Sequence, residues 1–196
     1  MSKTIRCIGI VVLLASVVGC DVFFVSREGR FNPLDPDNEF VEVYPEIDGY
    51  AEDIDWFDSD PVMFAQDTPT SSAIVIRFDA KDIPDDFDRI YLRLYKSVGT
   101  FPDSAIMIHP IVTDWAPPID YFLVNQTDFI DFDVFVRHYP QVNPGVELIN
   151  LDSIVAGSAD SIRYGVVIFS ELDRIEFQAM ETSDPQWKPR LYISTK

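Results

Sequence analysis

The chain has 196 residues, and its 33 Asp and Glu residues outnumber its 15 Lys and Arg residues, which gives a formal net charge of −18 at pH 7. A surface of that charge repels the phosphates of nucleic acids, so we expect no nucleic-acid partner. Apolar residues make up 47% of the chain, and 15 residues are Phe, so one domain of this size can bury a sizeable hydrophobic core.

The first 20 residues have the layout of an export signal. Lys3 and Arg6 form a short basic start, and an apolar run follows at residues 8–15. Residues 7–19 are too few to cross ~30 Å of hydrocarbon as a helix that rises 1.5 Å per residue, so we predict no transmembrane span here. A small residue at the cleavage point completes the layout of a secretory signal peptide, and Gly19 is that residue.

The segment Val17-Val18-Gly19-Cys20 resembles the end of a bacterial lipoprotein signal. The resemblance implies cleavage before Cys20 and acylation of that cysteine, so that lipid chains anchor the mature protein to a bilayer of the bacterial cell envelope. Asp21 follows the acylated position. In enterobacteria an aspartate there retains lipoproteins in the inner membrane, whereas other bacterial groups do not follow that rule. The inner and the outer membrane therefore both stay open.

Loss of the signal changes the chemistry of the mature chain. Cys7 leaves with it, so the mature domain has no disulfide and no free thiolate for catalysis or for a zinc or iron–sulfur site. Two basic residues leave and no acidic residue does, so the net charge changes from −18 to −20. An exported domain without disulfides depends on its hydrophobic core for stability.

We expect three parts in the chain. Residues 1–19 are the signal peptide, residues 20–44 are the acylated cysteine and a flexible tether, and residues 45–196 are the folded domain. The tether contains Pro33 and Pro36 among Asx residues, which disfavour helix and regular sheet.

Short apolar runs separated by turn signals predict an all-β domain after the tether. The clearest run is 89–96, where the apolar residues at even positions share one face and Tyr91, Arg93 and Tyr95 share the other. No strand–helix alternation occurs, so about eight or nine short strands favour an antiparallel β-sandwich. The expected strands cover residues 61–65, 73–78, 89–96, 104–113, 146–151, 164–169, 174–179 and 190–194, and residues 129–136 are expected to form an exposed strand or hairpin.

Several stretches also resemble a known family. Residues 74–79, 83–84 and 90–95, with the sequences IVIRFD, IP and IYLRLY, resemble the LLRFD…IP…AxLxLY centre of DNRLRE-type domains. Further similar stretches lie at residues 112–115, 164–168, 177–181 and 188–193. The resemblance covers about residues 45–195. It implies a jelly-roll-like β-sandwich of the kind found in secreted and surface proteins, some of which serve as carbohydrate-binding modules.

The sequence contains no motif of a known catalytic centre: no G-x-S-x-G, no H-E-x-x-H, no phosphate-binding loop and no G-x-G-x-x-G. Its two histidines, His109 and His138, are expected to be structural or surface residues. Carboxylates are too abundant for any pair to identify a glycosidase, which needs two carboxyl groups ~5–9 Å apart in a cleft. We therefore predict that the protein is not an enzyme and uses no organic cofactor.

Acidic residues crowd the loop after the predicted strand at 73–78, among them Asp79, Asp82 and Asp86. Calcium takes six to eight oxygen ligands, and clustered carboxylates on a loop can supply them. No D-x-[DN]-x-[DN]-G calcium loop is present. Two interpretations stay open: a structural calcium site at these three residues, and a solvated acidic loop in a chain that is acidic throughout, which we favour.

Exposed aromatic side chains stack on the flat faces of sugars, and polar neighbours hydrogen-bond the hydroxyl groups. The stripe of Tyr91, Arg93 and Tyr95 is the best candidate for such a surface, and Trp187, flanked by prolines, is expected to be exposed. Trp115 follows an apolar strand and is expected in the core. The alternative is that the stripe only covers the outer face of the sandwich.

Our first hypothesis is a lipid-anchored, non-catalytic binding module of the cell envelope whose ligand is a glycan, with Tyr91, Arg93, Tyr95 and Trp187 as ligand-binding residues. The anchor follows from the signal, and the ligand class rests on the family resemblance. The alternative is a structural envelope lipoprotein that contacts other envelope proteins and binds no sugar.

Overall fold

The computed structural model describes residues 40–67, 71–100, 104–155, 159–171 and 174–195. The predicted signal peptide, the lipidation site Cys20 and most of the predicted tether lie outside these residues. The folded domain begins before residue 45, because strand β1 (Val41–Val43) pairs antiparallel with β12 (Arg190–Thr195). The last residues of the segment assigned to the tether therefore belong to the sandwich.

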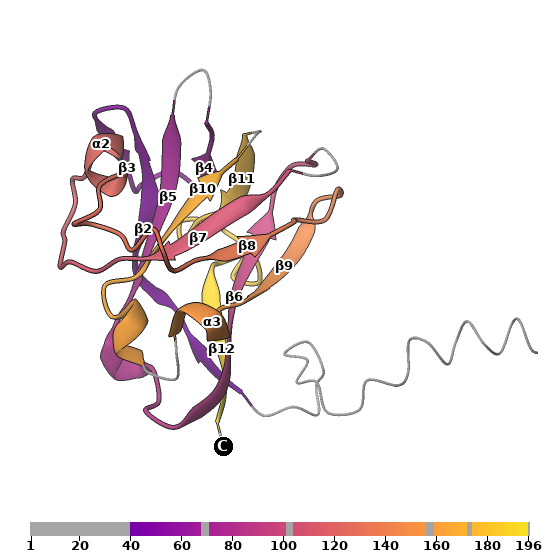
Figure 1. The fold of residues 1–196 in the computed structure, drawn as a ribbon. Coiled ribbons are helices and arrows are strands. Elements are labelled where there is room, and N and C mark those ends of the chain that lie inside the picture. Colours follow the sequence, from indigo (N-terminus) through magenta and orange to yellow (C-terminus); the bar gives the residue numbers. More distant parts are fainter. Residues whose placement is uncertain (1–39, 68–70, 101–103, 156–158, 172–173, 196) are drawn as a thin grey trace, which may run out of the picture. The chain divides into compact units, whose positions relative to one another are not determined.

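Two antiparallel sheets face each other across a hydrophobic core (Figure 1). Sheet A has the strand order β1-β12-β6-β11-β4, with β9 on the other side of β6. Its further strands are β6 (Phe87–Lys96), β11 (Ile175–Gln178), β4 (Val62–Ala65) and β9 (Gly145–Asn150). The predicted all-β antiparallel sandwich is confirmed.

Sheet B has the strand order β3-β2-β5-β10-β7-β8. These strands are β3 (Asp55–Phe57), β2 (Pro45–Glu52), β5 (Ser72–Phe78), β10 (Val166–Ser170), β7 (Ile106–Pro110) and β8 (Val136–His138). The described residues thus form twelve strands rather than the eight or nine expected, because short edge strands such as β1, β3 and β8 carry little alternation of their own.

Period-two alternation builds the core between the sheets. On β6 the inward residues Ile90, Leu92 and Leu94 are fully buried. On β12, Leu191 pairs with Leu92 and Ile193 pairs with Ile90, and these partners point to the same side because directly paired residues of antiparallel strands share a face. A one-residue shift in this register would expose the whole apolar set, so the core itself fixes the pairing.

A second hydrophobic core lies on the outer face of sheet B, under residues 112–135. Trp115 and Phe129 pack there with residues of the sheet such as Val75 and Val167, which confirms that Trp115 is a core residue. The expected strand at 129–136 is wrong: Phe129 and Ile130 are both buried at a turn, and only its last residue enters β8.

Four helical segments of three or four residues complete the described part of the chain: η1 (Ala80–Asp82), α2 (Tyr121–Val124), α3 (Asp152–Val155) and η2 (Ala159–Ile162). The short helix α2 begins at Asp120, whose carboxylate accepts a hydrogen bond from the Leu123 amide at 2.7 Å. Among the described residues, no helix has the length and apolar character needed to cross a membrane.

Candidate functional site

The stripe predicted on β6 faces away from the core. Tyr91 pairs across the sheet with Tyr192, and Arg93 pairs with Arg190, so both strands present aromatic and guanidinium side chains to the outer face of sheet A. Arg190 is fixed there, because its Nη1 donates hydrogen bonds to Glu42 Oε2 and to the Tyr44 hydroxyl, both at 3.0 Å.

The loop of residues 184–188 lies over this outer face. Nη1 of Arg93 donates a hydrogen bond to the Gln186 carbonyl oxygen at 2.6 Å, and Nη2 of Arg190 donates to the Pro185 carbonyl oxygen at 2.6 Å. Arg93 is therefore only 7% exposed. Its position differs from the one expected from the sequence: the guanidinium lies beneath the loop and holds it, and solvent barely reaches it.

Trp187 on this loop stacks on Tyr95 of β6, with ring centroids 4.9 Å apart and ring planes 20° apart. The turn that presents Trp187 is fixed by Asp184, whose carboxylate and carbonyl oxygens accept hydrogen bonds from the amides of Gln186 and Trp187 at 2.9 and 3.0 Å. Trp187 remains 37% exposed, as the sequence predicted. We call the stacked pair of Tyr95 and Trp187 the aromatic platform.

The four predicted ligand-binding residues do not all meet. Tyr95 and Trp187 are in contact, and Arg93 supports the loop beside them. Tyr91 is half-buried and lies four positions back along the same strand, about 13 Å from Tyr95 at ~3.3 Å per residue. The structure therefore reduces the stripe to one stacked pair with a buried support.

The calcium prediction concerns the loop after β5. Asp79 is the N-cap of η1, and its carboxylate accepts a hydrogen bond from the Lys81 amide at 3.0 Å, which lowers the pKa of Asp79. Among the described residues, no group of three or more His, Cys, Asp or Glu side chains is arranged to hold a metal ion. Calcium binding by Asp79, Asp82 and Asp86 stays a prediction.

The structure contains a buried charge cluster around Lys96 and Glu147 that the sequence analysis did not predict. Lys96 and Glu147 are 0% and 2% exposed, and Lys96 Nζ lies 3.6 Å from Glu147 Oε1. Lys96 Nζ also donates to Thr100 Oγ1 at 3.2 Å, while Nε2 of His138 lies 3.1 Å from Glu147 Oε2. Burial lowers the pKa of Lys96. The alternation of β6 could have predicted this cluster. Lys96 continues the inward positions 90, 92 and 94, and a lysine at such a position requires a buried partner.

Both histidines have structural surroundings. His109 is buried among the rings of Phe132, Phe135 and Phe169, and burial lowers its pKa. His138 contacts the buried Glu147.

Asp48 is another buried acid. It is 5% exposed, and its Oδ2 accepts a hydrogen bond from the Met180 amide at 2.9 Å. Burial, which removes the solvation of the charged form, raises the pKa of Asp48 to about 7, and the negative charge of Glu181 adds to the increase.

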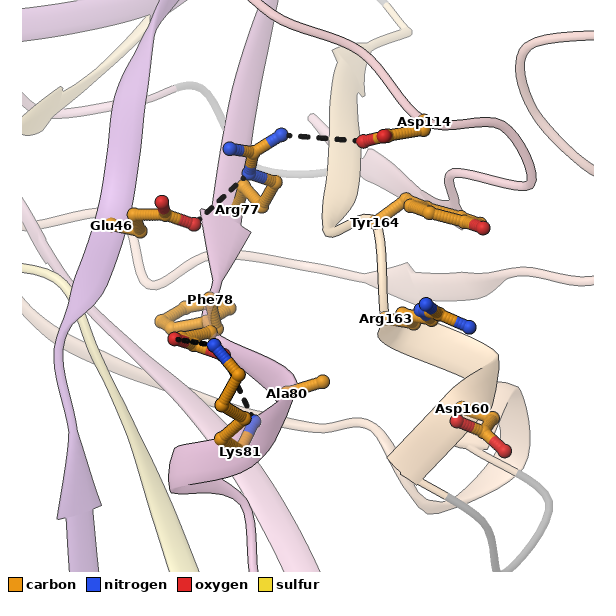
Figure 2. A pocket seen from close by; sticks show the side chains of 10 residues that line it. Glu46, Arg77, Phe78, Ala80, Lys81, Asp114, Asp160, Arg163 and Tyr164 are labelled. Carbon is orange, nitrogen blue, oxygen red and sulfur yellow. Dashed lines mark hydrogen bonds and ion pairs between the residues drawn. The ribbon is translucent and has the colours of Figure 1, made fainter.

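A hollow of about 430 Å³ lies where β5 runs into η1 and where η2 leads to β10 (Figure 2). Its charged lining consists of three cations, Arg77, Lys81 and Arg163, and four carboxylates, Glu46, Asp79, Asp114 and Asp160. Arg77 is fixed most firmly: its Nε lies 3.2 Å from Glu46 Oε2, and its Nη1 lies 3.6 Å from Asp114 Oδ1 and donates to the Trp115 carbonyl oxygen at 2.5 Å.

Comparison with known proteins adds no identity: no protein-family model matches the chain, and no curated protein matches it. The resemblance to DNRLRE-type domains therefore stays an expectation from the sequence.

Proposed function

We propose that this chain is a lipid-anchored, non-catalytic binding module of the bacterial cell envelope and that its aromatic platform binds a glycan. The observation that carries the proposal is the stack of Trp187 on Tyr95, which leaves Trp187 partly exposed. An exposed, flat indole ring next to polar groups suits the apolar face of a sugar ring.

The hydrogen bonds that hold the loop of Trp187 favour ligand binding, because the loop does not have to become ordered when the ligand arrives. The loop that carries Trp187 is already hydrogen-bonded to Arg93 and Arg190. A side chain that is held in its binding orientation loses less conformational entropy when a ligand arrives. In this proposal Tyr95 and Trp187 contact the glycan, while Arg93 positions the loop.

The anchor part of the proposal rests on the sequence of the first 20 residues, where a short apolar run ends at Gly19-Cys20. Acylated Cys20 would hold the module at a membrane of the envelope. Metabolic labelling of the expressing bacterium with a clickable palmitate analogue tests this part. Labelling that Cys20→Ser abolishes is the expected result, and unchanged labelling of that variant would contradict the anchor.

Binding of the detergent-solubilised full chain to a panel of immobilised polysaccharides tests the glycan part. We expect at least one polysaccharide to bind and Trp187→Ala and Tyr95→Ala to weaken that binding roughly tenfold, because one stacked aromatic contact contributes about 1 kcal/mol or more. Tyr139→Ala is the matched control, since Tyr139 is an exposed aromatic residue next to β8, outside the platform. No binding, or equal binding by all three variants, would contradict the proposal.

A specific observation also favours the second candidate, a structural lipoprotein that contacts other envelope proteins. Phe122 is 63% exposed, and Phe135 and Val142 are 44% and 49% exposed. Exposed aromatic residues are enriched where proteins associate. Capture of a partner from detergent-solubilised membranes that Phe122→Ser prevents would support this candidate, and a chain that purifies without companions would count against it.

A further inference from the structure

The hollow at the η1 end of sheet B is built by four separate chain segments. The start of β2, the β5–η1 junction, the segment at Asp114 and residues 160–164 all contribute to it. Figure 2 shows Arg77 and Lys81 on one wall and Arg163 and Tyr164 on the other. The hollow therefore has walls from separate chain segments on both sides.

Gly165 sets the distance between these walls. Its φ of +99° is a conformation that side chains other than glycine rarely adopt, and a Cβ at this position would collide with the backbone of Ile76 and Arg77. Gly165 is thus held directly against β5, and this contact fixes where the two residues before it, Arg163 and Tyr164, begin the opposite wall. This close approach positions one wall relative to the other without a ligand.

Most charges of the lining are already paired with one another. Arg77 lies between Glu46 and Asp114, and Lys81 Nζ lies 3.4 Å from Asp79 Oδ2. An ionic ligand would have to break one of these pairs to gain Arg77, Lys81 or one of their carboxylates as a full partner. A neutral ligand with hydroxyl groups has no such requirement, because paired carboxylates keep spare lone pairs and paired cations keep spare N–H groups.

Arg163 provides the donors on the opposite wall. Its guanidinium lies over the Tyr164 ring, 5.4 Å from the centroid, and it makes no ion pair with any residue that the structure describes. A cation–π contact with an aromatic ring orients a guanidinium, while the N–H groups in the guanidinium plane stay available. Arg163 can therefore donate hydrogen bonds to ligand oxygens that face it.

We propose that this hollow is a second ligand site, separate from the aromatic platform, and that it takes a neutral, hydroxyl-rich ligand of the size of one or two sugar rings. Its volume of about 430 Å³ falls within the ~300–1,000 Å³ of small-molecule sites. The hydroxyl groups donate to Glu46 and Asp79 and accept from Arg163. The site lies on sheet B and does not require Trp187.

The test measures binding of neutral monosaccharides and disaccharides (glucose, galactose, mannose, N-acetylglucosamine, maltose and cellobiose) to the full chain in detergent by saturation-transfer NMR and calorimetry. Arg163→Ala removes the guanidinium donors, and Ala80→Trp fills the hollow while leaving its charges in place. Arg137→Ala is the matched control, because Arg137 also lies 5.4 Å from the centroid of a tyrosine ring, that of Tyr139, but away from the hollow. The melting temperature of each variant reports whether it is folded.

We expect at least one sugar to bind with a millimolar or lower dissociation constant, Arg163→Ala to weaken this binding at least fivefold, and Arg137→Ala to leave it unchanged. Folded Ala80→Trp should not bind. Absence of binding by every sugar, or unchanged binding by Arg163→Ala, would overturn the proposal. Binding that is lost in Trp187→Ala and kept in Arg163→Ala would overturn it as well and would leave the platform as the glycan site, so the two proposals fail separately.

Discussion

Nη1 of Arg93 donates a hydrogen bond to the main-chain oxygen of Gln186 and thereby holds the neighbouring Trp187 against Tyr95. A strand residue thus fixes a loop that comes from the far end of the domain sequence. The guanidinium acts as a support: its burial under the loop excludes it from most direct contact with a ligand, while its loss should release the loop.

Arg93→Ala should therefore weaken glycan binding although both platform residues are still present. Loss of the hydrogen bond between Arg93 and Gln186 frees the loop, so that Trp187 becomes more mobile and more exposed. A red shift of tryptophan fluorescence should accompany the weaker binding. Arg89→Ala, on the same strand but outside this contact, should change neither quantity; a change in both variants would show a general effect on β6.

Because Lys96 and Glu147 form a buried pair, we expect the effects of their substitutions on the free energy of unfolding to be strongly coupled. Lys96→Met leaves Glu147 charged in the core, and we expect it to lower the free energy of unfolding by about 3–5 kcal/mol. Glu147→Gln should be destabilising for the same reason, since it leaves Lys96 without its charged partner.

The double variant Lys96→Met/Glu147→Gln should lose clearly less than the sum of the two single variants, because no unpaired charge is left inside. The glutamine can still accept the hydrogen bond that Glu147 takes from the Gln141 amide. Urea unfolding of the four proteins measures the coupling. Additive losses would mean that the pair contributes nothing as a pair.

The raised pKa of Asp48 predicts that the stability of the domain falls as the pH rises. Its pKa rises from 3.8 to about 7 on folding, so the folded state binds this proton more tightly than the unfolded state. The resulting stabilisation is complete below pH ~4 and is lost as the pH rises through 7. At 1.36 kcal/mol per pKa unit, the change is on the order of 4 kcal/mol at most.

Asp48→Asn removes this titration, while its amide oxygen can still accept from the Met180 amide. We expect the variant to be more stable than the natural chain at pH 8 and to lose that advantage at pH 5. Thermal unfolding across this range gives the comparison, with exposed Asp128→Asn as control. A parallel pH profile for Asp48→Asn and the natural chain would contradict the raised pKa.

Substitutions at two glycines with positive φ distinguish the cost of a steric clash from the cost of backbone strain alone. Gly165 and Gly145 both have positive φ, but a Cβ at Gly165 meets the backbone of β5, whereas a Cβ at Gly145 has nothing within 4 Å. Gly165→Ala should therefore destabilise the domain by at least ~1 kcal/mol more than Gly145→Ala does. Equal melting temperatures for the two variants would show that the β10 end is not held against β5.

The sequence was sufficient for the sandwich class and for the strand β6, because period-two alternation is a local signal that tertiary packing only reinforces. It predicted the exposure of Trp187 and the burial of Trp115 from their neighbours along the chain. It failed at Phe129 and Ile130, where adjacent apolar residues both enter the second core at a turn, which no strand period describes.

The candidate sites depend on contacts between distant segments, which a single sequence does not reveal. The pairing of Arg93 with Gln186 and of Arg77 with Asp114 brings together residues that share no local pattern. Lys96 is the exception, since its inward position on β6 could be read from the alternation. Sequence therefore indicated which side chains share a face, and the fold determined which of them meet.

Glycan binding at the platform is tested most directly by calorimetry. The experiment measures the affinities of the full chain and of its Trp187→Ala variant for the strongest ligand of the polysaccharide panel. We expect the natural chain to bind and the variant, folded to the same melting temperature, to bind roughly tenfold more weakly or not at all, while Tyr139→Ala binds as the natural chain does. Equal affinity of Trp187→Ala and the natural chain would contradict glycan binding at the platform.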